Sequence, residues 1–437
     1  MIFPGSALGF LMLLLHFFLP IIGDDTYFMA AAQTPDLLNW LWHRYNGWSS
    51  RVIIESFLLI IANSFLLWKI INIILILLLY YLFVKIFADQ HDNTTCWVCA
   101  FCILLYPFWH MNSAGYMTTT VNYLWPLVFA FISGYGMKKS FLNKKIQIWE
   151  YPIYISSLLY ASNIEQMNVL LLLIITLLFL YSSFQKRIDY YLLLQLLIVA
   201  AMLIFILTCP GNASRYSSEV LSWYPDYGML GFIEKLQLGY SSTLAHFIVS
   251  PNIVFTTFCI LLYISIHIQY SNILYKVIAA IPLLVYILFV IFNIFYSYDS
   301  NIIYWIRKIQ GVKNATSIIN YAPLLILGLC SILCIFVSIY LCFKNDRLKA
   351  LFCIMFIIFG LSSRIVMGFS PTIWASSYRT FIFIYFVFIV CIALFYQRLK
   401  IITFKHESVL FMTLCTLGIV SYLCSFFVLF HGNFRSI

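Results

Sequence analysis

The chain has 437 residues, of which 63% are hydrophobic and only 9% are charged. Soluble domains carry about 25% charged residues, so this composition, with a mean hydropathy of +0.97, excludes a water-soluble fold. The net charge of +10 does not indicate a nucleic-acid partner, because the Lys and Arg residues stand in short clusters between apolar runs and not along one soluble face.

Apolar runs long enough to cross a bilayer recur along the whole chain. A helix of about 17–25 residues crosses a hydrocarbon core of roughly 30 Å, which predicts an all-α bundle of about thirteen transmembrane spans in a single membrane domain, residues 1–437. The first run lacks the basic start and the cleavage site of a signal peptide, so we expect it to be retained. The predicted spans are 5–22, 66–87, 96–111, 122–137, 151–165, 168–184, 189–208, 245–268, 274–297, 319–343, 349–366, 379–397 and 407–430.

The segment 51–65 decides the orientation of the chain. Basic residues mark cytoplasmic loops, and four basic clusters occur, in 138–145, 186–187, 344–349 and 398–405. They fall on one side only if 51–65 does not cross the membrane. We therefore expect 51–65 to be an interfacial, juxtamembrane helix that closes a first external loop, so that loop and helix together cover 23–65.

Most of the unusual polar residues then lie in outer loops. Asp24 and Asp25 emerge directly after the first span, where neighbouring like charges tend to raise one pKa and so suit a general base. A solvated helix end with an incidental acidic pair is the competing interpretation. Glu165, at the tip of a hairpin between two later spans, is a reserve catalytic base, because a carboxylate is costly at that depth without a role.

Arginines and amides accompany these carboxylates. Arg215 and Arg379 each lie near a proline turn in an outer loop, and we expect them to approach each other and to hold a lipid phosphate, with Arg51 as a third contributor. Snorkelling toward lipid head groups is the alternative, although Arg364, inside a predicted span, is harder to explain that way. The expected substrate-binding residues are Asn46, Tyr123, Asn163, Gln166 and Asn212. For Tyr123, a capped helix start with an aromatic anchor is the alternative.

One carboxylate base and a few arginines suffice for one class of reaction. If the donor is a sugar on a polyprenyl phosphate, the leaving group needs only cations to hold its developing charge. The attacking sugar hydroxyl needs one base. We expect no metal and no other cofactor, because the sequence offers no clear carboxylate cage and its 12 cysteines lie almost entirely in apolar runs.

An acidic pair directly after the first span, in a long external loop that ends in a juxtamembrane helix, resembles the GT-C superfamily of polyprenyl-phosphate-sugar glycosyltransferases. Within it, the chain resembles the phage-encoded serotype-converting glucosyltransferases that modify O-antigen. The resemblance covers most of the chain in order and spacing. It is carried by Gly23-Asp24-Asp25, Asn46-Gly47-x-x-x-Arg51, Asn163-Ile164-Glu165-Gln166, Pro210-Gly211-Asn212-x-x-Arg215, and Ser370-Pro371 with Arg379.

This resemblance implies a multi-pass transferase of the bacterial inner membrane with its active site facing the periplasm. It implies that Asp24 or Asp25 is catalytic, that undecaprenyl-phosphate glucose is the donor, and that a lipid-linked glycan such as O-antigen is the acceptor. The implied partners, besides membrane lipid, are a flippase and a donor-synthesising transferase. The chain lacks the large soluble C-terminal domain of oligosaccharyltransferases, which disfavours transfer to a protein.

Two other classes remain open. O-antigen polymerases and ligases are also polytopic with periplasmic arginines, but they typically carry one very large periplasmic loop, whereas here the outer residues are spread over several modest loops. A transporter or flippase would show ionisable residues along mid-membrane helices and broken helices in symmetric halves. The few candidates for such residues include Lys69, Glu165 and Arg364.

Overall fold

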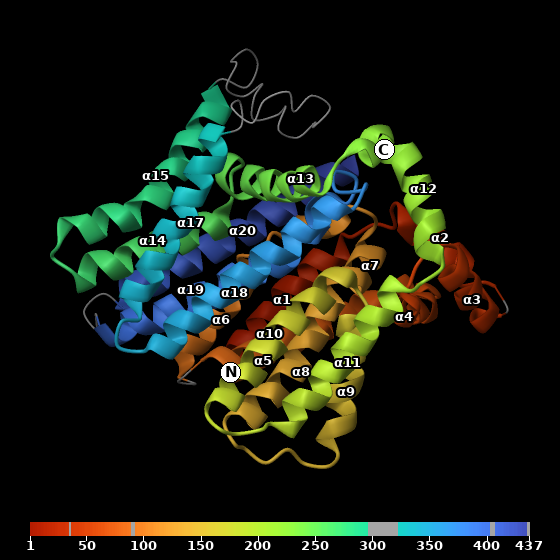
Figure 1. Ribbon diagram of the computed structural model, residues 1–437, viewed down its shortest axis with the longest axis horizontal. Coiled ribbons are helices and arrows are strands. Elements are labelled where there is room, and N and C mark those ends of the chain that lie inside the picture. Colours follow the sequence, from red (N-terminus) through yellow and green to blue (C-terminus); the bar gives the residue numbers. More distant parts are fainter. Residues whose placement is uncertain (35, 89–91, 296–321, 403–406, 435–437) are drawn as a thin grey trace.

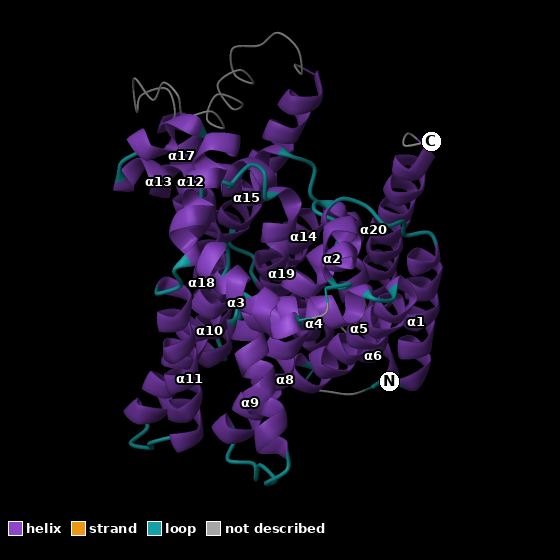
Figure 2. Cartoon of the chain, turned by 90° about the vertical axis from the view of Figure 1, so that its right-hand side faces the viewer, coloured by secondary structure: helices purple, strands orange, loops and turns teal. Residues whose placement is uncertain are grey.

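The computed structural model describes residues 1–34, 36–88, 92–295, 322–402 and 407–434, and every regular element in these ranges is a helix. The helices of the bundle lie side by side, and shorter helices gather at its ends (Figures 1 and 2). The bundle helices are α1 (Ile2–Phe17), α5 (Phe65–Phe87), α6 (Asn93–Leu104), α8 (Trp125–Phe141), α9 (Glu150–Ser162), α10 (Glu165–Phe184), α11 (Tyr190–Leu207), α14 (Ile253–Gln269), α15 (Ile273–Phe295), α17 (Ala322–Cys342), α18 (Arg347–Ile365), α19 (Ile382–Ile402) and α20 (Glu407–Phe434).

The all-α, polytopic fold is confirmed, but the number of full-length spans is lower than predicted. Among the described residues, eight helices are long and apolar enough to cross a membrane, or nine if one bent pair is a single span, against about thirteen expected. Prolines account for part of the difference: α6 ends three residues before Pro107, and the predicted span 245–268 is broken by a 73° bend beside Pro251. The end of 274–297 and the start of 319–343 lie outside the described residues.

The segment 51–65 does not form a span. It folds as α4 (Val52–Ala62), whose 11 residues are too few to cross a bilayer. α4 contacts α2 (Asp24–Ala31), α3 (Leu37–Gly47) and α5, so it closes the loop that follows α1. This arrangement agrees with the juxtamembrane helix predicted from the distribution of basic residues.

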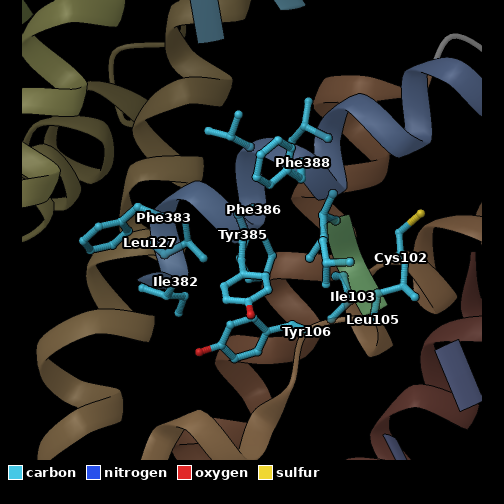
Figure 3. Close-up of a cluster of buried hydrophobic side chains, with 14 of the residues drawn as sticks. Cys102, Ile103, Leu105, Tyr106, Leu127, Ile382, Phe383, Tyr385, Phe386 and Phe388 are labelled. Carbon is cyan, nitrogen blue, oxygen red and sulfur yellow. The ribbon is translucent and has the colours of Figure 1, made fainter. Parts of the chain in front are cut away.

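α19 is the central helix of the bundle. All its residues from Ile382 to Gln397 are buried, as befits a helix that is apolar on every face. Figure 3 shows Phe383 and Tyr385 of α19 among the side chains of Tyr106 and Leu127 from neighbouring segments. The short 3-10 helix η8 (Ser377–Phe381) runs directly into α19 and so belongs to the most completely buried of the candidate spans in the described residues.

The four basic clusters meet at one end of the bundle, here called the basic end. The loops that join α8 to α9 and α10 to α11 lie there, at the bottom of Figure 2. This common location is what the sequence predicts for loops that share one side of a membrane. Two contacts join the clusters or the residues directly beside them: Arg187 donates to the carbonyl of Ser140, and Arg398 donates to that of Cys342.

The opposite end, here called the site end, carries most of the short helices. They are α2, α3, α4, α7 (Tyr116–Thr119), α12 (Gly211–Trp223) and α13 (Phe232–Leu244), and in Figure 1 they lie at the top and right of the bundle. α12 packs so closely on the end of α3 that a Cβ on Gly211 would lie 2.3 Å from the backbone nitrogen of Trp48. The predicted outer loops that the structure describes are thus brought into mutual contact.

Candidate active site at the site end

The acidic pair after α1 divides into two carboxylates with different roles. Asp25 is fully buried and accepts hydrogen bonds from the backbone N–H of Thr118 (2.8 Å), the hydroxyl of Thr118 (2.9 Å) and the backbone N–H of Met117 (3.3 Å). Burial raises the pKa of Asp25, and the hydrogen bonds from Thr118 partly offset this effect. Asp25 therefore fixes the start of α7, and its carboxylate oxygens are already used in hydrogen bonds to Met117 and Thr118.

Asp24 is the available carboxylate of the pair. It begins α2 with its side chain at the surface, and no residue in the described part of the chain pairs with that side chain by a hydrogen bond or an ion pair. Partial burial raises its pKa above the ordinary value of 3.8, while the more distant charges of Arg379 and Arg44 act in the opposite direction. A carboxylate with a raised pKa and free oxygens suits proton abstraction.

Two glycines set the position of Asp24. Gly23 (φ +55°) and Gly115 (φ +123°) both adopt backbone conformations that L side chains rarely take. Between them, the backbone N–H of Asp24 donates to the carbonyl of Ala114 at 2.7 Å. A Cβ at Gly23 would lie 2.7 Å from that carbonyl, and one at Gly115 would collide with the carboxylate of Asp25. The Gly-Asp-Asp sequence thus has a steric reason to begin with glycine.

A chain of charged side chains crosses the site end from α4 to α12. Arg51 donates to Glu165 at 2.7 Å, and Arg215 lies 3.9 Å from the other oxygen of the same carboxylate. Arg215 also pairs with Glu219 at 2.7 Å, four residues further along α12. Glu165 is therefore occupied by two arginines, which favours a positioning role for this carboxylate over that of a base.

Arg379 enters the site from η8. It donates to the carbonyl of Ser113 at 3.2 Å, and it lies within hydrogen-bonding reach of the hydroxyl of Tyr123. Arg51 connects Arg379 with Arg215, because it pairs with Glu165, which Arg215 also approaches, and because it lies, like Arg379, within electrostatic range of Tyr123. The approach of Arg215 to Arg379 itself stays a prediction.

Tyr123 is the point on which several guanidinium groups converge. It is buried in a π-helical turn, η2 (Thr120–Leu124), a local geometry that is frequent at functional sites. Arg51, Arg364 and Arg379 all lie within electrostatic range of its hydroxyl. The residue that was predicted to bind substrate is therefore at the centre of the cationic cluster.

Arg364 and Gln166 lie behind this cluster, in the protein interior. Arg364 is 1% exposed and donates to the hydroxyls of Thr380 (2.7 Å) and Ser242 (3.1 Å). Gln166 donates to the backbone carbonyls of Ser363 (3.0 Å) and Thr380 (3.2 Å) and so joins α10, α18 and η8. Gln166 is positioned to hold these three segments together.

The three asparagines predicted to bind substrate serve the local backbone. The Oδ1 of Asn163 accepts from the N–H groups of the first residues of α4, and its Nδ2 donates to the carbonyl of Ser50 at 3.0 Å. Asn212 donates to the carbonyl of Ile206 at 2.7 Å, and Asn46 to that of Trp42 at 2.8 Å. Asn163 is fully buried, whereas Asn46 remains exposed beside the loop.

Sequence reasoning missed two acidic partners. Glu55, buried in the apolar helix α4, forms a two-pronged pair with Arg44 (2.8 Å at both contacts), and the Arg44 guanidinium lies over the rings of Trp40 (5.2 Å) and Trp48 (5.9 Å). Glu219 is the other. The spacing of four residues from Arg215 to Glu219 on one helix was the available signal.

An apolar cavity of about 380 Å³ lies beneath the charged cluster, between α8, α10, α18 and α19. Its lining includes Met167, which is two residues from Glu165, and Phe383, which is four residues from Arg379. One helical turn is about 5.4 Å long, so this end of the lining lies within about a turn of Glu165 and Arg379 along the chain. Lys138 and Lys349 line its other end, beside the basic end of the bundle.

These parts together offer a free carboxylate, a cluster of arginines and an apolar chamber within one membrane bundle. Such a combination can bind an amphiphile with an anionic head group and can remove a proton from a hydroxyl beside it. Among the described residues, no group of His, Cys, Asp and Glu side chains is arranged to hold a metal ion. No known protein family, curated protein or solved structure matches the chain.

Proposed function

We propose that this protein is a glycosyltransferase that moves a sugar from a polyprenyl-phosphate donor to a lipid-linked glycan at the site end of the bundle. The observation that carries the proposal is the free carboxylate of Asp24 within electrostatic range of Arg379 and Arg44, in a bundle that also encloses an apolar cavity. The GT-C-like order of motifs along the chain supports it independently. Glucose as the sugar, O-antigen as the acceptor and the periplasm as the location rest on that resemblance.

The polyprenyl chain would occupy the apolar cavity, and its phosphate would lie beside Arg379, Arg51 and Tyr123. Apolar walls match an isoprenoid chain, and guanidinium groups match the phosphate by charge and by their planar donor geometry. The first sugar would then extend beyond the arginines, toward the surface where Asp24 lies. This placement gives each part of an amphiphilic donor a chemically matched surface.

In the proposed reaction Asp24 removes the proton of an acceptor hydroxyl as the hydroxyl oxygen attacks the anomeric carbon. The bond from the anomeric carbon to the phosphate oxygen breaks, and its electron pair goes to the phosphate. The arginines stabilise the charge that appears there, so no general acid is required. Asp25 holds the loop that positions Asp24, through its hydrogen bonds to Thr118.

The cavity also favours one other candidate, a transporter for a phosphorylated lipid, because its lining extends from Met167 and Phe383 to Lys138 and Lys349 at the basic end. Transport needs no base, so the carboxylate of Asp24 distinguishes the two functions. A transporter with Asp24→Asn would keep its activity, and a transferase would lose most of it.

The test is the mass of the host glycan. Bacteria that make a lipid-linked O-antigen would express the full chain or its Asp24→Asn variant, with Asp36→Asn as the matched control, because Asn also caps a helix and Asp36 caps α3. We expect the wild type and Asp36→Asn to add one hexose per repeat and Asp24→Asn to add almost none. No added hexose in any membrane-inserted form would refute the proposal, and a changed number of repeats would indicate a polymerase.

A further inference from the structure

Arg364 is a buried cation whose charge is not neutralised by a carboxylate in the described part of the chain. Its side chain donates to two hydroxyls, its guanidinium lies 3.8 Å from the ring centre of Phe381, and its Nε has no hydrogen-bond partner. A buried guanidinium is costly unless it is paired. Hydroxyls, an aromatic face and the C-terminal end of α18 stabilise it only partly.

Arg364 contributes to the net charge of the cluster around Tyr123. Besides Asp24, the connected cluster in the described residues holds five arginines and three glutamates: Arg44, Arg51, Arg215, Arg364, Arg379, Glu55, Glu165 and Glu219. Five positive and three negative charges leave two positive charges for Asp24 and the ligand to balance. One of these resides on the partly exposed Arg379, and the other resides on the buried Arg364.

We propose that Arg364 supplies the second uncompensated positive charge of this cluster and thereby matches the site to a phosphate dianion, the leaving group of the proposed transfer. The inference rests on the proposed function and adds the charge state that the site prefers. Arg364 acts here through its electric field as a positioning residue, because its donors are already directed at Thr380 and Ser242.

The charges then balance at each stage of the reaction. Before transfer, ionised Asp24 and the phosphodiester of the donor together carry two negative charges, which offset the two spare positive charges. After transfer, Asp24 holds the proton of the acceptor and is neutral, while the released phosphate monoester carries nearly two negative charges above its second pKa of about 6. The site therefore stays close to neutral while charge moves from the carboxylate to the phosphate. Without Arg364 it would be one positive charge short throughout.

The test compares two probes that differ by one charge. Farnesyl phosphate and its methyl diester would be titrated at pH 8 into the purified full chain in lipid nanodiscs, and binding would be measured by calorimetry. Coulomb energy is proportional to the charge of the probe. At an effective dielectric constant near 20 and a separation of about 12 Å, one unit of probe charge corresponds to about tenfold in affinity. We therefore expect Arg364→Gln to weaken binding of the diester about tenfold and of the monoester about 100-fold.

Two controls separate charge from structure. Arg364→Lys retains the charge, so the ratio of monoester to diester affinity should stay at the wild-type value even if both affinities fall. Arg187→Gln removes an equal charge at the basic end, where Arg187 pairs with Asp189, and should leave both affinities unchanged.

An equal loss for the two probes in Arg364→Gln, or no preference for the monoester in the wild type, would overturn the inference and leave the proposed function standing. If neither probe binds the wild type, the phosphate site itself is refuted, and the inference falls with it. A ratio that falls about tenfold in Arg364→Gln and holds in Arg364→Lys would support the role of the charge.

Discussion

The two ends of the bundle are both rich in positive charge, but they differ in how the positive side chains are paired and how far they are exposed. At the basic end, some cations pair with carboxylates, as in Arg187 with Asp189 and Lys400 with Asp92, Arg398 donates to a backbone carbonyl, and further charge lies on exposed residues such as Lys144 and Lys145. At the site end, two arginines, Arg379 and Arg364, have no carboxylate partner among the described residues, and Arg364 is fully buried. Exposed spare charge is hydrated at little cost, whereas buried spare charge calls for an anionic ligand. The charges at the basic end can therefore orient the chain in the membrane, whereas the buried charge at the site end can bind an anionic substrate.

Replacement of Asp24 should give the largest effect. Asp24→Asn keeps the size of the side chain and removes its charge, so we expect kcat/KM for sugar transfer to fall by roughly 10²–10⁴-fold. The measurement is a transfer assay in proteoliposomes, with Asp36→Asn as the control that keeps activity. Asp25→Asn should lower the thermal stability, because Asp25 accepts three hydrogen bonds from Met117 and Thr118.

Retained activity in Asp24→Asn, together with its loss in Glu165→Gln, would identify Glu165 as the base. Loss of activity in Asp25→Asn at unchanged thermal stability would instead exchange the roles of the two aspartates.

Arginine-to-lysine exchange should give the next largest effect, and only at the site end. Arg51→Lys and Arg379→Lys keep the charge but lose the planar fork, and hydrogen bonds to charged groups contribute about 1.5–3 kcal/mol. Transfer should therefore slow by roughly 10–150-fold. Arg187→Lys is the matched control, because Arg187 also donates to Ser140 and Asp189 through its fork, yet at the basic end. Equal losses at both ends would show that the fork serves folding and not the phosphate.

The pH dependence of transfer should report Asp24. A general base acts only when deprotonated, so kcat/KM should fall about tenfold per pH unit below its pKa and level off above it. Since partial burial raises the pKa of Asp24, this acidic limb should lie above the ordinary aspartate value of 3.8. A rate profile measured between about pH 4 and 8 checks this. A limb at or below that value would argue against Asp24 as the base.

Cysteine labelling should sharpen the comparison of the two ends without affecting activity. Ser214 and Lys145 are exposed at the site end and the basic end respectively, whereas Ser49 and Ser140 are buried and would report poorly. In intact cells, a membrane-impermeant thiol reagent should modify Ser214→Cys and not Lys145→Cys, relative to the parent chain. The reverse pattern would place the arginines on the cytoplasmic side.

The sequence predicted which loops lie at the same end of the bundle better than it predicted which side chains pair with one another there. Short basic clusters predicted which loops gather together, since the cost of moving such charges through lipid depends on composition alone. The acidic pair was also found, but not the division of labour within it, because that depends on the backbone of α7 reaching Asp25. The buried pair of Arg44 and Glu55 was not predicted either, because it too depends on a contact between two helices and because Glu55 stands in a largely apolar helix.

The uneven lengths of neighbouring helices have a consequence for the surrounding lipid. α1 has 16 residues and α6 has 12, so their helical parts are about 24 Å and 18 Å long, whereas the adjacent α5, with 23 residues, is about 34 Å long. A bilayer adapts to a short apolar stretch by thinning locally. Such thinning beside α1 would draw the lipid head groups down toward Asp24, which follows that helix by seven residues in the chain. The protein would then shape the membrane so that a substrate anchored in it arrives at the depth of the carboxylate.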